Sequence, residues 1–238
     1  MRRAILTAAA VVMVSGCGMR LGNPDPVEYQ AVAIAAGPAA TAEQTAAQIR
    51  AANADVALLV AAKDSSWISD VARRAQLVST RPGRLGEQTF AFLGAKPVGD
   101  TTLAIKVQSG GELKVHDALY NIDKTRHLDL LTVSIDRGTN VRDAVTRLLG
   151  YVATDVYPNA AIILAVHTAT PEQADTMAVA TRAAMGDAWE CTQASRQGGA
   201  PSPANLRLFY FPAARISCES ARVLDSPPGI TAQLIVQR

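Results

Sequence analysis

The chain has 238 residues, of which 49% are hydrophobic and 18% charged, and its formal net charge at pH 7 is +2. A chain of this length and apolar content can bury the core of one large domain or two small ones. The near balance of charge and the low aromatic content, 5%, exclude the basic surface and stacking platforms typical of nucleic-acid binding, so no nucleic-acid partner is expected.

Residues 1–16 have the pattern of an export signal. Arg2 and Arg3 form a basic start, residues 4–14 are apolar apart from Thr7, and small residues precede Cys17. The apolar run is too short to span a bilayer, which takes about 20 apolar residues. We therefore expect residues 1–16 to be a signal peptide that is removed on export.

The segment Val14-Ser15-Gly16-Cys17 resembles the lipobox of bacterial lipoproteins. The resemblance covers only residues 1–17. It implies cleavage before Cys17, which then carries diacylglycerol and usually an amide-linked acyl chain such as palmitate, so that two or three chains anchor the protein to the membrane. Because Gly18 rather than Asp follows the cysteine, the resemblance implies the periplasmic face of an outer membrane. In a cell without an outer membrane it implies the outer face of the cytoplasmic membrane.

The mature chain is expected to start with a short tether. Residues 17–26 contain two Gly and two Pro and link the lipid to a domain at 27–238. Loss of Arg2 and Arg3 from the 23 basic residues balances them against the 21 acidic ones, so the mature chain is neutral. We expect residues 27–238 to form a single mixed α/β domain or one divided into two sub-lobes.

Strands and helices alternate in the first part of this domain. The apolar pattern predicts a strand over 27–36, a helix over 41–53, a strand over 55–62 and a helix over 65–78. The first helix opens with Thr41-Ala-Glu-Gln44, the spacing of a capping box.

Shorter strands follow, and then the clearest helix of the chain. Strands are predicted over 88–93, 101–108, 112–120 and 127–135, with a Gly-Gly hairpin turn before the third. In residues 137–157 the apolar side chains recur at helical spacing, which predicts a helix with one apolar face.

The last part combines a buried strand, a helix and further strands. Seven consecutive apolar residues predict a buried strand over 160–166. Thr170-Pro-Glu-Gln173 then opens a helix that ends at Gly186. Further strands are predicted over 187–193, 206–218 and 230–237, with interruptions at Pro212 and Pro227-Pro228. The elements predict an α/β or α+β fold of two or three layers, in which about four helices pack on a mixed sheet.

The two T-x-E-Q segments, 41–44 and 170–173, each follow a strand and open an Ala-rich helix. They indicate either a duplicated unit or two ordinary capped helices, and the second interpretation is favoured.

Cys191 and Cys218 remain as a pair once Cys17 is lipidated. In an oxidising envelope such a pair predicts a disulfide, which would link the C-terminal strands. The alternative is two unpaired buried thiols, and no further cysteine is left to form a metal site.

Two residues are candidates for catalysis. Asp136 directly follows the strand 127–135, and His167 follows the strand 160–166. If these strands are parallel neighbours, the two side chains lie at their carboxyl ends, where open α/β sheets bind ligands, and the aspartate could orient the histidine as a general base. The alternative is that both are turn and cap residues.

No metal site or cofactor is expected. His116, Asp117 and His127 could hold a metal only if their strands brought them onto one face, and exposed strand positions are the favoured interpretation. Familiar motifs of hydrolases, nucleotide enzymes and zinc enzymes do not occur in the sequence.

The leading functional hypothesis is a lipid-anchored, non-catalytic binding or assembly module that recognises an envelope protein or a cell-wall component. By this hypothesis the protein is not an enzyme. The alternatives are an envelope hydrolase that uses Asp136 and His167, and a small solute-binding lipoprotein, which would need a deep cleft between two lobes.

Overall fold

The computed structural model describes residues 25–191 and 205–237. The predicted signal peptide (1–16), Cys17 and most of the tether lie outside these residues. Among the described residues, no helix is long and apolar enough to cross a membrane.

The described strands form two sheets. The first has the order β12-β13-β1-β2-β5-β3, with β4 paired to β5. Its strands are β1 (Val27–Ala36), β2 (Val56–Ala61), β3 (Val78–Ser79), β4 (Gly83–Leu85), β5 (Gln88–Gly94), β12 (Ile216–Leu224) and β13 (Gly229–Val236). β1 and β2 run parallel, because helix α1 (Ala42–Ala51) carries the chain back between them. Helix α2 (Ser65–Ala75) follows β2.

The second sheet has the order β10-β11-β9-β8-β7-β6. Its strands are β6 (Gly99–Lys106), β7 (Glu112–Asn121), β8 (His127–Ile135), β9 (Ala160–Thr168), β10 (Trp189–Glu190) and β11 (Leu206–Phe211). β8 and β9 run parallel and are joined through helix α3 (Val141–Thr154). Helix α4 (Pro171–Met185) follows β9.

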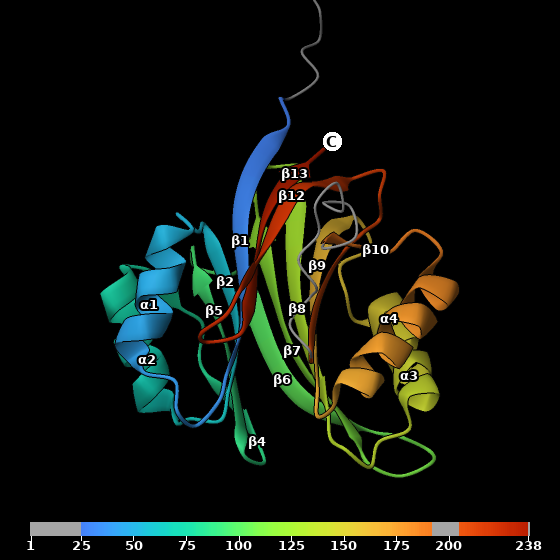
Figure 1. Cartoon of the computed structure of the whole chain (residues 1–238). Helices are drawn as coiled ribbons and strands as arrows, with labels where there is room; N and C mark the ends of the chain where they lie inside the picture. The colour runs from blue at the N-terminus through green and yellow to red at the C-terminus, as the bar shows by residue number, and fades with distance from the viewer. Residues whose placement is uncertain (1–24, 192–204, 238) are drawn as a thin grey trace, which may run out of the picture.

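The two sheets pack face to face, and the helices cover their outer faces (Figure 1). Small apolar side chains such as Ala31, Ala33 and Ala35 of β1 lie between the sheets, together with larger ones such as Phe92 and Ile163. The alternate residues of the same strands pack against the helices, α1 and α2 on one side and α3 and α4 on the other. The expected mixed α/β class is confirmed, but with two sheets and four layers instead of one sheet in two or three layers.

The T-x-E-Q segments do not occupy equivalent places. Helix α1 joins two parallel neighbours, whereas the strand that follows α4 is β10, which pairs only with β11 among the described strands. Thr41 and Gln44 form a full capping box. In the second segment Gln173 instead donates from Nε2 to the carbonyl oxygens of Asp136 and Arg137. Two ordinary capped helices therefore explain the similarity.

The predicted disulfide between Cys191 and Cys218 is confirmed, with a Cα separation of 5.6 Å and a sequence separation of 27 residues. It joins the residue after β10 in the second sheet to β12 in the first sheet. The bond therefore links the two sheets covalently, and both sulfurs belong to the inter-sheet core.

Replacing both cysteines by serine should lower the free energy of unfolding by about 3 kcal/mol, because the closed loop restricts the unfolded chain. Urea unfolding of the oxidised protein and of the double variant would measure this difference. Equal urea midpoints for the two proteins would contradict the expected stabilisation.

Candidate functional site

The carboxyl ends of the two parallel strand pairs meet at one end of the sandwich, which we call the rim. It is the lower end in Figure 1, opposite the start of β1. All the parallel strands, β1, β2, β8 and β9, lead into a helix at this end. The N-caps of these helices, Thr41, Asp64, Asn140 and Thr170, therefore lie around the rim. Helix N-termini carry partial positive charge, which favours anions there.

A cavity of about 240 Å³ opens at the rim between the two sheets. Most of its wall is apolar or small, and its polar side chains are His167, Gln88 and Asn205. The residues that line this rim cavity are Ala35, Ala36, Gly37, Val60, Ala62, Gln88, His167, Asn205 and Pro228. The cavity thus combines elements from both sheets around one histidine.

His167 is held by hydrogen bonds to both ring nitrogens. Its Nδ1 lies 3.1 Å from Oγ of Ser134 and 3.5 Å from Nε2 of Gln88. Its Nε2 lies 3.3 Å from Nδ2 of Asn205. Ser134 is the β8 residue paired with His167 in the parallel register, so both side chains point toward the other sheet. In the tautomer in which Asn205 donates to Nε2, the ring proton is on Nδ1 and is donated to Ser134, and Nε2 is the proton acceptor. Gln88, whose amide nitrogen can only donate, then contacts Nδ1 without a hydrogen bond.

The imidazole of His167 is neutral at physiological pH. Burial and, to a smaller extent, the positive charge of Lys114 lower its pKa, the negative charge of Asp136 raises it, and the net pKa is about 4. Burial disfavours the charged imidazolium because the site supplies less solvation than water does. His167 is therefore ready to accept a proton over the whole neutral range.

A buried lysine stands next to this histidine. Lys114 of β7 pairs in register with Ser134, so Lys114, Ser134 and His167 form one row across three neighbouring strands. The Lys114 side chain is only 8% exposed, and its Nζ donates to Oδ1 of Asp136 at 2.8 Å. Lys114 therefore places a buried positive charge beside Ser134 and His167. Its partner Asp136 is exposed to solvent at the rim.

The structure brings the two predicted catalytic residues to the same rim. β8 and β9 are parallel neighbours, as the sequence-based argument required, and Asp136 follows the last residue of β8. Among the described residues, the ring of His167 contacts Ser134, Gln88 and Asn205, and Asp136 bonds Lys114. Asp136 therefore influences His167 through charge, and its catalytic role stays a prediction.

Sequence reasoning missed Ser134, Asn205, Gln88 and Lys114. Ser134 had a usable signal, since Thr132 and Ser134 are polar residues two positions apart in an otherwise apolar strand and so mark one face of it. Asn205 and Gln88 reach the site only through tertiary packing from distant segments.

The expectation that His116, Asp117 and His127 occupy exposed strand positions is wrong for His116 and Asp117, which are buried, and the three side chains lie in different surroundings. His116 is buried between the sheets, where it stacks on Phe92 with ring centroids 4.5 Å apart, and burial lowers its pKa to about 4. Asp117 is the next residue of β7 and points to the helix-covered face, where it accepts a hydrogen bond from Tyr151. His127 contacts Tyr157 at the start of β8.

The rim side chains do not fit a protein-bound metal ion. Divalent metals in phosphatases and nucleases are held mainly by carboxylates and imidazoles. Among residues 25–191 and 205–237, no group of three or more His, Cys, Asp or Glu side chains lies close enough to hold one.

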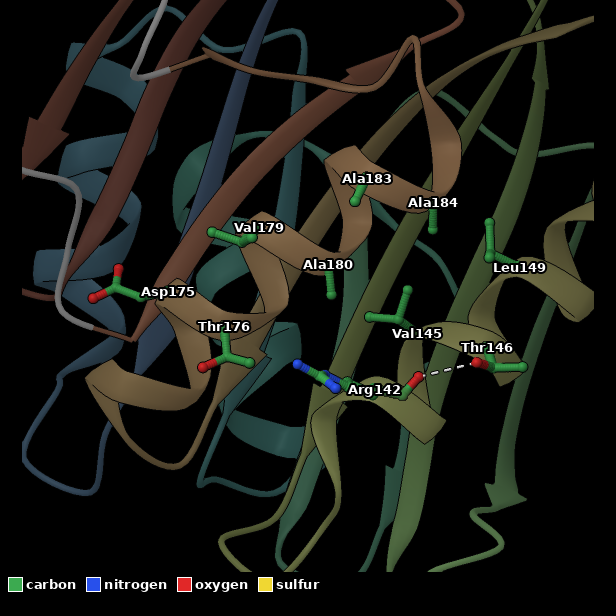
Figure 2. Close-up of a pocket in the computed structure, with 10 residues that line it drawn as sticks. All are labelled: Arg142, Val145, Thr146, Leu149, Asp175, Thr176, Val179, Ala180, Ala183 and Ala184. Atoms are coloured by element: carbon green, nitrogen blue, oxygen red, sulfur yellow. Dashed lines mark hydrogen bonds between the residues drawn. The ribbon is translucent and has the colours of Figure 1, made fainter.

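A wider groove of about 670 Å³ runs between α3 and α4 on the outer surface. Figure 2 shows Val145 and Leu149 of α3 facing Ala180 and Ala184 of α4 across it. The groove is mostly apolar, and its charged lining residues are Arg142 and Asp175. Asp175 is already paired with Arg207, so the groove is better suited to burying a partner than to chemistry.

The fold has relatives among solved structures. No protein-family model matches the chain, and no curated protein matches it in sequence. A Bacteroides thetaiotaomicron protein of the endonuclease/exonuclease/phosphatase family matches with a TM-score of 0.67 at 7% identity, over 90% of this chain and 100% of that chain. TDP2 of D. rerio, solved with a single-strand DNA product, matches with a TM-score of 0.59 at 13% identity, over 87% of this chain and 98% of that chain. An endonuclease/exonuclease/phosphatase from Beutenbergia cavernae has a TM-score of 0.56 at 11% identity, over 88% of this chain and 72% of that chain.

These matches correct the function expected from the sequence. The expectation of a non-catalytic binding or assembly module, and of a protein that is not an enzyme, is wrong, because solved chains that share this architecture are named as endonuclease/exonuclease/phosphatase proteins. The error has a physical reason: the polar groups of the rim come from positions 88, 114, 134, 167 and 205, so no short motif contains them. The chain has the fold of the endonuclease/exonuclease/phosphatase proteins.

Proposed function

We propose that this protein is a phosphate-ester hydrolase whose reaction takes place in the rim cavity. One observation carries the proposal: a neutral imidazole, His167, lines a cavity at the carboxyl ends of the parallel strands. Open α/β sheets place ligands at this end. Solved proteins with the same fold are named as endonuclease/exonuclease/phosphatase proteins, and this name supports phosphate esters as the substrate class.

The electrostatics of the rim suit an anionic substrate. All the described helices begin there, and their N-terminal N–H groups favour negative charge. Lys114 adds a buried positive charge, and Lys63 follows the cavity residue Ala62. A cavity of about 240 Å³ suits a phosphate group with a small ester substituent, so we favour a small phosphomonoester.

The proposed chemical step is attack of water on phosphorus with His167 as the catalytic residue. Nε2 of His167 takes a proton from the water while its oxygen forms the new bond to phosphorus. The bond between phosphorus and the ester oxygen breaks, and the proton passes to the leaving alkoxide. Ser134 is a positioning residue that fixes the ring through Nδ1, and Asn205 marks the place at Nε2 where the water would bind.

Substrate binding would strengthen this base. A phosphate anion beside the ring favours the imidazolium and so raises the pKa of His167 from its value of about 4 in the free protein. The histidine would thus become a better proton acceptor only when the cavity holds an anion.

Replacing His167 by glutamine should reduce hydrolysis of p-nitrophenyl phosphate roughly 10²- to 10⁴-fold, the range typical of a lost general base. The matched control is His127→Gln, because His127 is the first residue of β8 and so lies at the opposite end of this strand from the rim; the same substitution there should leave the rate unchanged. Equal loss in both variants, or wild-type activity in His167→Gln, would refute the role of His167.

The pH dependence of the rate should differ between the free protein and its substrate complex. Because His167 must be neutral to act as a base, kcat/KM should fall as the pH drops through about 4, and kcat should fall at a higher pH. The charge of Lys114 lowers the pKa of His167, so Lys114→Met should move the pH at which kcat/KM falls upward, toward 6.5. The charge of Asp136 raises this pKa, so Asp136→Asn should move that pH downward. An acid limb that neither variant moves would show that another group titrates.

We further propose that a lipid on Cys17 anchors this hydrolase to a membrane of the cell envelope. β1 begins at the end of the sandwich opposite the rim (Figure 1). An anchor that precedes β1 would therefore hold the rim away from the lipid surface, open to substrates in solution. The basic start, short apolar run and lipobox-like residues of the N-terminus support the anchor.

Cys17→Ala should leave the precursor uncleaved and shift the protein from the membrane fraction, or change the membrane in which it resides. Metabolic labelling with a palmitate analogue, followed by fractionation, would measure both effects. A variant that is still cleaved and still bound to the same membrane would refute lipidation at Cys17.

A further inference from the structure

A second cavity, of about 450 Å³, lies on the helix-covered face of the second sheet. It is bounded by the start of β6, by β7 and β8, and by the C-terminal end of α3. We call it the acidic cavity, because its lining includes four aspartates, Asp100, Asp117, Asp129 and Asp155, and no lysine, arginine or histidine.

Asp129 is the least exposed of these acids. It is 2% exposed, and its buried Oδ1 has no hydrogen-bond partner among the described residues. Asp129 faces Leu119 in the antiparallel register of β7 and β8, and Asp117 faces Leu131, so the two carboxyl groups are diagonal neighbours on one sheet face. Asp117 already accepts a hydrogen bond from Tyr151 at 2.7 Å. Buried polar atoms normally have a hydrogen-bond partner. The unpaired Oδ1 of Asp129, next to a second acid, therefore indicates that a ligand with hydrogen-bond donors could bind here.

The end of α3 adds negative charge of its own. The carbonyl groups at a helix C-terminus carry partial negative charge, which lysine or arginine in the last turn commonly offsets. The last turn of α3 has no basic residue, and its C-cap is Asp155. The sheet and the helix therefore both give the acidic cavity a negative potential.

We propose that the acidic cavity binds the primary ammonium group of a small organic molecule. An ammonium group brings three hydrogen-bond donors and a positive charge, which match the free Oδ1 of Asp129 and the neighbouring carboxylates. A divalent metal fits less well, because the described residues hold no group of three or more metal-binding side chains close enough together. The site is separate from the rim and does not depend on the proposed hydrolase activity.

Binding at this site should release a proton. Burial raises the pKa of Asp129, and the hydrogen bond and negative charge of Asp117 raise it further, while the backbone N–H of Tyr157 opposes the shift. The other titratable groups of the cavity are Asp100, Asp155 and Tyr157, and the hydroxyl of Tyr151 lies next to Asp117. A bound ammonium favours the ionised carboxylate, so the affinity should rise with pH.

Calorimetric titration of the full mature chain with 1,4-diaminobutane tests the proposal, and 1,4-butanediol serves as the neutral analogue. The diamine should bind, the diol should not, and the heat should depend on the ionisation enthalpy of the buffer because a proton is released. Asp129→Asn should weaken diamine binding roughly 10- to 100-fold, the effect of losing a buried charge-assisted hydrogen bond.

Two further variants keep the result interpretable. Asp100→Asn changes an exposed acid of the same cavity and should weaken binding less, whereas Asp187→Asn changes an exposed acid elsewhere and should leave it unchanged. Equal affinity of wild type and Asp129→Asn, no binding of the diamine, or tighter binding of Mg²⁺ or Ca²⁺ than of the diamine would overturn the proposal.

Discussion

The face-to-face packing of the two sheets determines where chemistry can occur in this protein. Alanines of β1 and larger apolar residues of the facing strands exclude water along most of the inter-sheet layer. The layer ends at the rim, where the carboxyl ends of both parallel pairs meet and polar side chains replace apolar ones. His167 sits at this transition, so it is desolvated enough to stay neutral and still lines a cavity.

The same connectivity gives the molecule two electrically different ends. Each parallel pair needs a crossover helix, and each crossover helix must begin where the first strand of its pair ends. The crossover helices α1 and α3 therefore begin at the rim, and α2 and α4 begin there too because they follow β2 and β9, the second strands of the two pairs. The C-terminus of α3 lies over the acidic cavity, where Asp155 and the sheet aspartates add to its partial charge. The direction of the parallel strands thus explains both features: the rim favours anions, and the surface at the end of α3 favours cations.

Most elements could be predicted from the sequence because their patterns are local. The strand 27–36 and the strand 127–135 have the bounds that alternation and apolar runs predict, and the capped helices begin within a residue of their Thr caps. The short strands β3 and β4 escaped prediction because they are too brief to show a period. The division into two sheets could not be predicted, because strand pairing depends on long-range contacts such as that of β1 with β13. For the same reason, Asp136 and His167 could be placed at one rim, but the contacts of His167 with Gln88 and Asn205 could not.

The two buried histidines show why position must be weighed together with electrostatics. His116 and His167 both point between the sheets, and burial lowers both pKa values to about 4. His116, however, stacks on Phe92 and lies within hydrogen-bonding distance of Thr102 and Thr80, and it is completely enclosed. A neutral histidine without access to a substrate contributes packing and hydrogen bonds only. His167 has a similar electrostatic state but lines a cavity, so the difference between a core histidine and a candidate base is one of access at the rim.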